Sequence, residues 1–411
     1  MKFNIITLGC KVNMYESNYI SESLVNNGFS FCEDNKLCDV IIVNTCSVTD
    51  TSDKKCLKTA RRVKRENPNA ILVICGCSSQ NSFEPYKNIG AQIIIGTKDK
   101  SKIVDLIKDY QKSHQDYCYI TKDREIPFET MSLNDFNQVR AYIKIQDGCN
   151  NFCSYCIIPY VRGDIRSRDF ASIITEAQSL AQKGFKEIVL TGIHTGSYND
   201  SDKDLYDLIE ELSKIDSLKR IRLSSIEITE LNDKFINILK TNKKFCDHLH
   251  IPLQSGCDEI LKVMNRKYDT TYYEEKIKLI RSIRPDISIT TDVIVGHNYE
   301  TDELFMKTYE FCQKIDFAKI HVFPYSKRSG TATSRMKGEV SEPDKKKRTR
   351  QLINLSEILE KKYYDKFIGK ELDVLIEYNH DGKSFGHTSN YLGITVDELL
   401  KVNEIYQRKI Q

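Results

Sequence analysis

Three closely spaced cysteines are the residues with the clearest chemical meaning in this chain. Cys149, Cys153 and Cys156 form a CxxxCxxC pattern within one short stretch. A four-iron cluster normally takes four thiolates, one per iron, so three cysteines leave one iron without a protein ligand. An open iron can hold the amino and carboxylate groups of S-adenosylmethionine (SAM), and an electron from the cluster can cleave SAM to a carbon radical. The aromatic Tyr155, directly before the last cysteine, suits a loop that wraps such a cofactor.

Zinc and scattered free thiols are the alternative interpretations of this stretch. Structural zinc sites prefer CxxC pairs with a fourth ligand nearby. No fourth cysteine or histidine follows the pattern within reach. The spacing therefore favours an iron–sulfur cluster with one open iron.

A second set of cysteines lies near the N-terminus, just beyond the ends of apolar runs. Its members are Cys10, Cys46 and Cys77. In an open parallel sheet the carboxyl ends of the strands meet at one rim, where ligands bind. The three thiols can therefore converge and hold another cluster with an open iron. Ordinary buried thiols are the alternative, and periodicity does not decide between Cys75 and Cys77.

The elements that must position the second set indicate an α/β domain. Short apolar runs alternate with helical patterns up to about residue 97, which predicts a parallel sheet covered on both faces. The runs are Phe3–Leu8, Val40–Asn44, Ile71–Ile74 and Gln92–Ile95, and the helical patterns lie near Tyr15–Asn26, Asp53–Glu66 and Asp99–Tyr110. Residues 111–138 are polar and read as a linker.

A second series of apolar runs begins at Val139, with helical segments between most of them. Six βα units predict an incomplete (β/α)6 barrel, and such barrels place their chemistry on loops at the carboxyl ends of the strands. The CxxxCxxC loop directly follows the first of these runs, as this rule requires. The runs are Ala141–Gln146, Glu187–Thr191, Arg220–Ser224, His248–Ile251, Ile287–Val295 and Lys319–Phe323.

The C-terminal part combines a basic helix with a small β module. Ser341-Glu342-Pro343 predicts the start of the helix, which runs to about Phe367. Strand-like stretches follow at Glu371–Tyr378 and His387–Val396, separated by a turn at Asp381-Gly382. The predicted α/β architecture therefore has three parts. They are an N-terminal parallel-sheet domain (1–113), a barrel with its basic helix (135–366) and a β module (367–411).

The composition of the 411 residues excludes several classes of protein. Hydrophobic residues make up 40% and charged residues 29% of the chain, as in soluble globular proteins. No apolar run approaches the roughly 18 residues of a membrane span, and the N-terminus lacks a signal peptide's apolar core. We therefore expect a cytoplasmic protein with no membrane partner. Fourteen cysteines in a reducing compartment indicate metal binding rather than disulfides.

The order and spacing of several motifs resemble the radical SAM methylthiotransferases, in particular the bacterial threonylcarbamoyladenosine tRNA methylthiotransferases. The resemblance covers nearly the whole chain. It rests on Leu8–Asn13, Asn44–Thr49, Gly76–Gln80, Gln146–Tyr160, Leu190–His194, Arg222–Glu227, His248–Gly256, His321–Ser326 and Gly386–Leu392. The family implies an N-terminal methylthiotransferase domain, a radical SAM barrel and a C-terminal TRAM-like module. Its Gly-Cys element matches Gly76-Cys77, which implies that Cys77 is the ligand.

The resemblance also implies two 4Fe-4S clusters and SAM as cofactors. The cluster of the CxxxCxxC loop would bind SAM and produce a 5′-deoxyadenosyl radical, which takes hydrogen from C2 of an adenine. The N-terminal cluster would carry a sulfur that a second SAM methylates. The implied substrate is threonylcarbamoyladenosine next to the anticodon of tRNA. The implied partners are the anticodon stem-loop, an electron donor of the flavodoxin or ferredoxin type, and a sulfur source.

Three rival functions remain beside this one. Two keep the chemistry and act instead on isopentenyladenosine in tRNA or on an aspartate of a ribosomal protein. The third is a non-catalytic iron–sulfur protein that binds RNA. Such a protein needs no open iron, so two separate three-cysteine sets argue against it.

Further residues are assigned by resemblance, and no catalytic residue is among them. Thr191 and Gly192 lie where this superfamily often contacts the SAM amino group. Glu227 and Gln254 follow later strands and can hold the cofactor or the adenine. Ordinary hydrogen bonding within loops is the alternative for all four.

Two further features of the sequence are its clusters of basic residues and its two departures from the family pattern. Arg162, Arg166 and Arg168 can meet tRNA phosphates, with a solvated surface as the alternative here and for the lysines at 345–347. The segment Gly296–Thr301 lacks the phenylalanine, proline and second glycine usual in the family. The TRAM-like region is also short, which predicts a module that lacks a strand.

Overall fold

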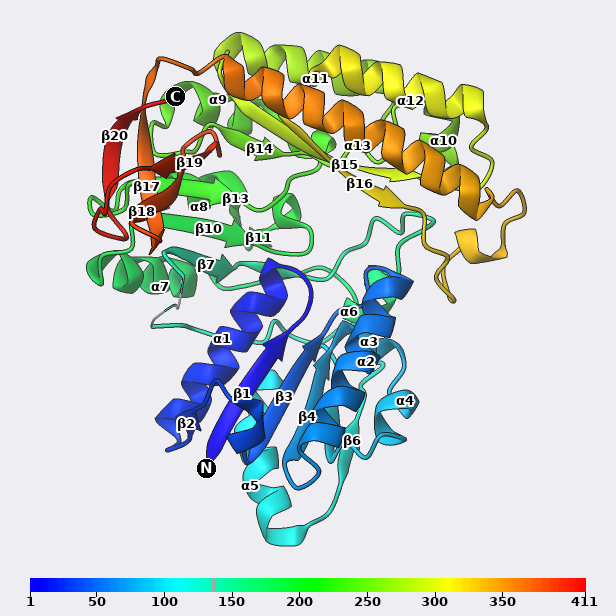
Figure 1. Ribbon diagram of the computed structural model, residues 1–411, viewed down its shortest axis with the longest axis vertical. Helices are drawn as coiled ribbons and strands as arrows, with labels where there is room; N and C mark the ends of the chain where they lie inside the picture. Colours follow the sequence, from blue (N-terminus) through cyan, green and yellow to red (C-terminus); the bar gives the residue numbers. More distant parts are fainter. Residues whose placement is uncertain (135, 137) are drawn as a thin grey trace. The chain divides into compact units, whose positions relative to one another are not determined.

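The computed structural model describes residues 1–134, 136 and 138–411. Its contacts divide the chain into two compact units. The N-terminal unit comprises Met1–Asp135, Gln146–Arg168 and Ser326–Thr331, and the barrel unit comprises Phe136–Ile145, Asp169–Tyr325 and Ala332–Gln411. The predicted α/β class is confirmed, with an antiparallel sheet at the C-terminus (Figure 1).

The N-terminal unit is built on a six-stranded parallel sheet in the order β2-β1-β3-β4-β5-β6. The four strands that the sequence predicts are confirmed as β1, β3, β4 and β5. The bounds are β1 Lys2–Thr7, β2 Ser30–Phe31, β3 Val40–Thr45, β4 Ile71–Gly76, β5 Ile93–Ile95 and β6 Tyr117–Tyr119.

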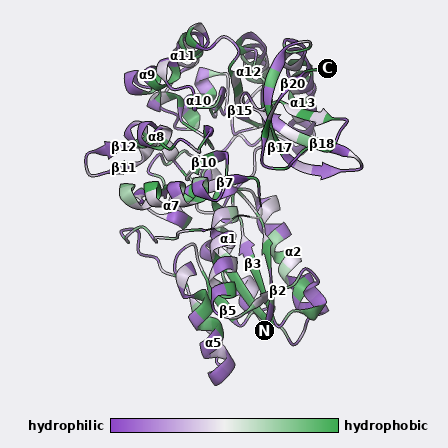
Figure 2. Ribbon diagram, turned by 90° about the vertical axis from the view of Figure 1, so that its left-hand side faces the viewer, coloured by the Kyte–Doolittle hydropathy of each residue, from purple (hydrophilic) through white to green (hydrophobic). Residues whose placement is uncertain are grey.

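Helices cover both faces of this sheet because its strands are apolar on both sides. Val40 and Ile42 of β3 pack with α1 (Lys11–Asn26) and α5 (Ile103–Ser113). The alternate residues Ile41 and Val43 pack with α2 (Asp50–Glu66) and α4 (Glu84–Lys87). Each such aliphatic side chain contributes about 1.5–3 kcal/mol when fully buried. Figure 2 shows the hydrophobic residues concentrated on these strands.

The linker predicted over residues 111–138 is partly wrong. Tyr117–Tyr119 forms β6, the last strand of the sheet, and Met131 and Leu133 are buried. This part of the chain therefore packs with the N-terminal unit beyond the predicted boundary at residue 113. Residues 135 and 137, including the predicted start of the barrel domain, lie outside the described residues. The three-part division stays a prediction.

The barrel unit contains all six predicted parallel strands. They form two sheets, β13-β10-β7 and β14-β15-β16, which a parallel bridge between Ile221 and Phe245 connects. The strands are β7 Arg140–Lys144, β10 Glu187–Thr191, β13 Arg220–Leu223, β14 His248–His250, β15 Ser288–Val295 and β16 Lys319–Pro324. The helices are α7 Phe170–Gln182, α8 Leu205–Ser213, α9 Asp233–Thr241, α10 Asp258–Val263, α11 Thr270–Ile283, α12 Asp302–Ile315 and α13 Glu342–Asp365.

The basic helix α13 begins where the sequence predicts, with the Ser341 hydroxyl accepting from the Asp344 amide at 3.2 Å. The interpretation of its lysine run as a solvated face is wrong for Lys345, which is buried with its ammonium 5.6 Å from the Tyr325 ring. Arg348 is buried too and pairs with Glu300 at 2.9 Å. Helix α13 thus packs on the atypical loop Gly296–Thr301, where burial lowers the pKa of His297 to about 4.

Four antiparallel strands form the C-terminal module, in the order β19-β18-β17-β20. They are β17 Glu371–His380, β18 Lys383–Thr388, β19 Gly393–Val396 and β20 Ile405–Lys409. The predicted turn is confirmed, and Asp381 and Gly382 both have positive φ, as a two-residue hairpin turn requires. The strand predicted over His387–Val396 is divided into β18 and β19, and β20 was not predicted. No helix of the described residues is long and apolar enough to span a membrane.

Candidate metal and cofactor sites

The three N-terminal cysteines lie at the carboxyl ends of neighbouring strands. Cys10 caps α1 after β1, Cys46 follows β3, and Cys77 follows β4 and begins α3 (Cys77–Asn81). Because β1, β3 and β4 are adjacent in the sheet, the thiols share one rim. Burial raises the pKa of Cys46 to about 12, and the nearby Cys77 and Cys10 raise it as well.

Gly76 allows the chain to turn between β4 and Cys77. Its φ is 107°, and a Cβ there would lie 2.4 Å from the carbonyl oxygen of Thr45 on the adjacent strand. A residue with a side chain would therefore push β3 and β4 apart at the rim. The Gly-Cys element is required by this close approach of the two strands.

The structure separates Cys75 from Cys77. Cys75 is fully buried in the apolar core between the sheet and the helices α1 and α5. Cys77, two residues further, contacts Ile157 and Val161, which follow the CxxxCxxC pattern. The position of Cys77 at the rim supports its choice as the predicted ligand.

The CxxxCxxC pattern lies on a closed loop. Two short antiparallel strands, β8 (Gln146–Asp147) and β9 (Arg166–Ser167), join the ends of the loop. The Cys149 amide donates to the Gly163 carbonyl at 3.1 Å, and the Cys156 amide donates to the Cys153 carbonyl at 2.9 Å. The three cysteines are partly exposed, and Tyr155 lies in the turn between the last two.

This loop belongs to the N-terminal unit rather than to the barrel unit. The helix α6 (Ile158–Arg162) that follows the cysteines packs against α3. The Thr97 hydroxyl also donates to the Val161 carbonyl at 2.9 Å. Both cysteine sets are therefore held in one compact unit, which the sequence did not predict.

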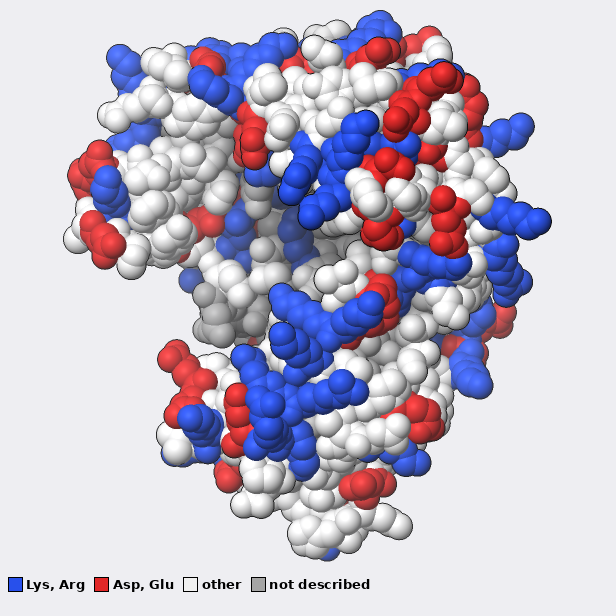
Figure 3. Space-filling view, turned by 45° about the vertical axis from the view of Figure 1, so that its right-hand side comes forward, with Lys and Arg blue, Asp and Glu red and all other residues white. Residues whose placement is uncertain are grey.

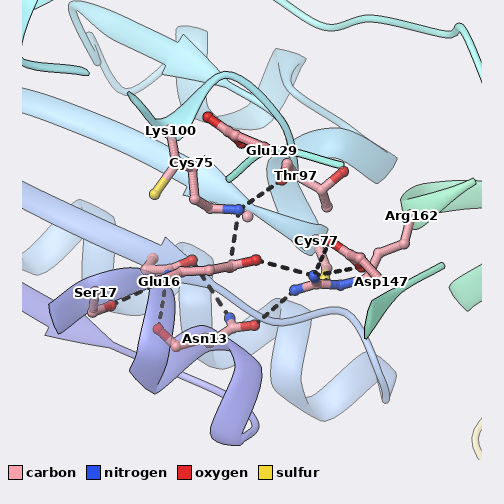
Figure 4. A network of polar contacts seen from close by, with 12 residues as sticks. Asn13, Glu16, Ser17, Cys75, Cys77, Thr97, Lys100, Glu129, Asp147 and Arg162 are labelled. Carbon is pink, nitrogen blue, oxygen red and sulfur yellow. Dashed lines mark hydrogen bonds and ion pairs between the residues drawn. The ribbon is translucent and has the colours of Figure 1, made fainter. Parts of the chain in front are cut away.

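Arg162 connects the two sets of cysteines and is completely buried. Figure 4 shows its side chain among Cys77, Asp147 and Glu16. Its Nε donates to the Cys77 sulfur at 3.3 Å, and its Nη1 pairs with Asp147, two residues before Cys149, at 3.1 Å. Nη1 also pairs with Glu16 at 3.1 Å, and Nη2 donates to Asn13 Oδ1 at 3.0 Å. Every nitrogen of the guanidinium thus has a protein partner.

Lys100 and Asn13 extend this network. Lys100 pairs with Glu16 at 2.9 Å, with both side chains fully buried, so each of the two buried cations Arg162 and Lys100 has a carboxylate partner. The Asn13 amide donates to the carbonyls of Leu8 and Thr45, at 2.8 and 2.9 Å. Asn13 therefore connects, through these two hydrogen bonds, the segments that carry Cys10 and Cys46.

The electrostatics of the network suit thiolate ligands. Burial raises the pKa of Cys77, and Arg162 acts against that rise. Iron ligation requires deprotonated thiols, so a buried cation beside Cys77 favours the form that binds metal. All six cysteines are free of disulfides. Among the described residues, no group of three or more Cys, His, Asp or Glu side chains is arranged so that it could hold a metal ion.

The interpretation of the arginines after the loop as phosphate contacts is wrong. Arg162 and Arg168 are 0% exposed, and Arg168 donates to the Tyr15 hydroxyl at 3.1 Å. The side chain of Arg166 is 9% exposed and lies 3.6 Å from Asp147. A further buried arginine, Arg328, donates to the Ser47 hydroxyl at 2.6 Å, next to Cys46.

The predicted cofactor residues of the barrel unit follow the ends of its strands. Thr191 ends β10, with Gly192 next to it, and its carbonyl accepts from the Ile145 amide at 2.9 Å. Glu227 forms an ion pair with Arg266. Gln254 has a φ of 65° and donates through its backbone to Asp292 at 2.8 Å.

A polar cluster to which the sequence assigned no role lies on the neighbouring strands β14, β15 and β16. His250 Nε2 lies 3.3 Å from Asp292 Oδ2, and its Nδ1 lies 3.0 Å from the Thr290 hydroxyl. The His250 and His321 rings are 5.7 Å apart. Burial lowers the pKa of His321, and His250 lowers it further. Polar residues alternate along these strands, as at His248 and His250, and this alternation could have indicated the cluster from the sequence.

Comparisons with known proteins match two parts of the chain. Residues 143–312 match the Radical SAM superfamily, and residues 2–96 match an uncharacterized protein family, UPF0004. The chain is 40% identical to the Bacillus subtilis threonylcarbamoyladenosine tRNA methylthiotransferase MtaB, over 94% of this chain and 88% of the relative. It is 34% identical to a tRNA-2-methylthio-N(6)-dimethylallyladenosine synthase from Thermodesulfovibrio yellowstonii, over 99% and 95% of the two chains.

A solved structure shares the fold. The radical SAM methyltransferase TsrM from Kitasatospora setae aligns with a TM-score of 0.58 and 15% identity. The alignment covers 79% of this chain and 74% of TsrM.

Proposed function

The chain belongs to the radical SAM methylthiotransferase family, and from this premise we propose that it transfers a methylthio group to C2 of threonylcarbamoyladenosine next to the anticodon of tRNA. Enzymes of this family use SAM and two 4Fe-4S clusters. The observation that carries the proposed activity is the pair of three-cysteine sets in one compact unit. The name of the Bacillus subtilis relative supports the choice of substrate.

Each cysteine set has one task in this proposal. Cys149, Cys153 and Cys156 hold the cluster that binds SAM, and Cys10, Cys46 and Cys77 hold the other. When bound, the clusters supply the electron that cleaves SAM and the site of the sulfur that is transferred, with a second SAM as methyl donor. Reduction and sulfur supply need outside partners, namely a flavodoxin or ferredoxin type of electron donor and a sulfur source.

The remaining polar residues position and shield these groups. Arg162 provides a counter-charge beside Cys77, and Asn13 holds the ends of β1 and β3 at a fixed separation. In the barrel unit, Thr191, Gly192, Glu227 and Gln254 contact SAM or the adenine. The left-handed backbone of Gln254 supports this role, because strained backbone is concentrated at ligand sites.

The chemistry of the modified adenine explains how the enzyme would select threonylcarbamoyladenosine over isopentenyladenosine. An anticodon-loop adenine is single-stranded, so it enters a pocket at a low unstacking cost. The threonylcarbamoyl group carries a carboxylate, whereas the dimethylallyl (isopentenyl) group is apolar. Because a buried carboxylate without a partner is costly, a pocket built for it contains polar groups that an apolar substrate leaves unpaired.

A competition between two tRNAs tests the substrate. Anaerobically reconstituted protein receives equal amounts of tRNA with threonylcarbamoyladenosine and tRNA with isopentenyladenosine, and mass spectrometry of nucleosides measures both products. We expect the first to be preferred by about ten-thousandfold, as for sites that pair polar groups of the substrate. A preference for the isopentenyl tRNA would reject the substrate and leave the chemistry standing. Absence of 5′-deoxyadenosine would reject the chemistry.

A further inference from the structure

A row of basic residues runs along the exposed face of α2. The helix packs on the sheet through one stripe of buried residues, namely Cys56, Ala60 and Val63. On the opposite face, basic residues recur at the same helical spacing and are all exposed. We call them the α2 basic row: Lys54, Lys58, Arg61 and Arg65.

Helix α2 carries a high net positive charge. Its 17 residues include seven basic and three acidic side chains, a net charge of +4. The whole chain of 411 residues carries only +3. The rest of the chain therefore carries a net charge of −1 (+3 minus +4), so this helix is more positive than the chain as a whole. Figure 3 shows Lys and Arg side chains gathered in the lower part of the view, over the N-terminal unit.

These cations are not used by the fold. Lys54 pairs with Asp50 at 2.6 Å. Within the part of the chain that the structure describes, Lys58, Arg61 and Arg65 have no ion pair or hydrogen bond through their side chains. Only Arg65 lies in the last turn, where a cation stabilises the helix dipole. The row is available to an external anion.

The row also lies next to the candidate cluster site. Helix α2 begins shortly after Cys46, and the Cys46 amide donates to the sulfur of Cys56 in α2 at 3.3 Å. Seventeen residues of helix extend over about 25 Å at 1.5 Å per residue. A linear anion bound along the row would therefore have one end near the N-terminal end of α2, the end that packs beside Cys46 through its buried face.

We propose that the α2 basic row binds the phosphate backbone of the RNA substrate. This inference rests on the proposed action on tRNA. Lys and Arg contacts to phosphates fix the register and orientation of a nucleic acid without reading its sequence. A protein partner fits less well, because protein interfaces have an apolar centre and α2 exposes no large hydrophobic side chain.

Salt dependence of tRNA binding tests the proposal. The variant Lys58→Gln/Arg61→Gln/Arg65→Gln removes three charges from the row. The control Lys102→Gln/Lys108→Gln/Lys112→Gln removes three from the region of α5, on the other face of the same sheet. Fluorescence anisotropy measures the affinity of reconstituted protein for full-length tRNA at several KCl concentrations. Iron content and thermal unfolding confirm that both variants are folded.

We expect the slope of log K against log salt to fall by about 2–3 in the α2 variant. Affinity at 0.1 M salt should fall at least about tenfold, while the control keeps the parent slope. Equal slopes in the two variants would overturn the proposal, even if the parent protein modifies tRNA. An unchanged slope with slower reduction by an acidic flavodoxin would assign the row to a protein partner instead. A parent protein that neither binds nor modifies tRNA would reject the proposed function itself.

Discussion

The two sets of cysteines are held in different ways within the same unit. Cys149, Cys153 and Cys156 lie on one loop, whose ends β8 and β9 join. Cys10, Cys46 and Cys77 instead follow three separate strands. The first set depends on local hydrogen bonds, whereas the second exists only when the sheet is folded. The loop set should therefore tolerate damage to the sheet that the second set does not.

The largest expected effect separates the two sets. Replacing Cys149, Cys153 and Cys156 together by alanine should remove about half of the roughly eight iron atoms and abolish reductive SAM cleavage. Replacing Cys10, Cys46 and Cys77 together should remove the other half and stop methylthiolation while SAM cleavage persists. Iron analysis and chromatography of 5′-deoxyadenosine measure both effects. SAM cleavage that survives the first change would contradict the assignment of the open iron.

Replacing Arg162 should destabilise the sites of both cysteine sets at once. Arg162→Gln removes one partner of Asp147 and one partner of Glu16, and should lower the free energy of unfolding by about 3–5 kcal/mol. Urea titration of the metal-free protein measures this loss. Arg65→Gln, an exposed change, should stay within about 0.5 kcal/mol of the parent.

The variant Arg162→Lys sharpens this test. It keeps the charge but cannot reach Cys77, Asp147 and Asn13 together, so we expect partial recovery of stability and lower iron occupancy than in the parent. An Arg162→Gln protein as stable as the parent would show that the network does not connect the sets.

A matched pair of glycines tests the dependence on the sheet. Gly76→Ala places a Cβ 2.4 Å from the Thr45 carbonyl, whereas Gly28→Ala meets no atom within 4 Å. Both residues have positive φ, so alanine costs each about 1–2 kcal/mol of backbone strain. We expect only Gly76→Ala to lose the N-terminal cluster as well, measured as iron per chain, while SAM cleavage is retained. Equal iron contents in the two variants would rule out a role for the clash.

The last comparison concerns the iron content of variants at two neighbouring cysteines, Cys75 and Cys77, and the change at Cys75 has the smallest expected effect. Cys75→Ala leaves a small core cavity and should cost about 1–2 kcal/mol, with the full iron content kept. Cys77→Ala should lose the N-terminal cluster and methylthiolation. Iron lost only in Cys75→Ala would reverse the assignment of this loop.

Much of the scaffold could be predicted because strands buried on both faces are apolar throughout. The run Val40–Asn44 is such a strand, and the turn after it made Cys46 a candidate. Strand β6 was missed because Tyr117–Tyr119 is short and lies in a polar stretch.

The role of Arg162 could not be predicted from its type. Arginine is almost never fully buried unless it is paired, and the partners Glu16 and Asp147 become visible only in three dimensions. Arg328 lies 281 residues from Ser47 in the sequence, so no local pattern connects them. The charged neighbours of Lys345 led to the prediction of a solvated side chain, yet Lys345 packs on Tyr325.

The division of the N-terminal unit into three separate segments has a consequence for biosynthesis. Asp53 must wait for its partner Arg328 while 275 further residues are synthesised, which takes roughly 15–55 s at 5–20 residues per second. During this interval the ribosome also produces all six strands of the barrel unit. The unit that carries both cysteine sets is therefore completed only late in translation, because the buried Arg328 beside Cys46 is in place only after most of the chain has been synthesised.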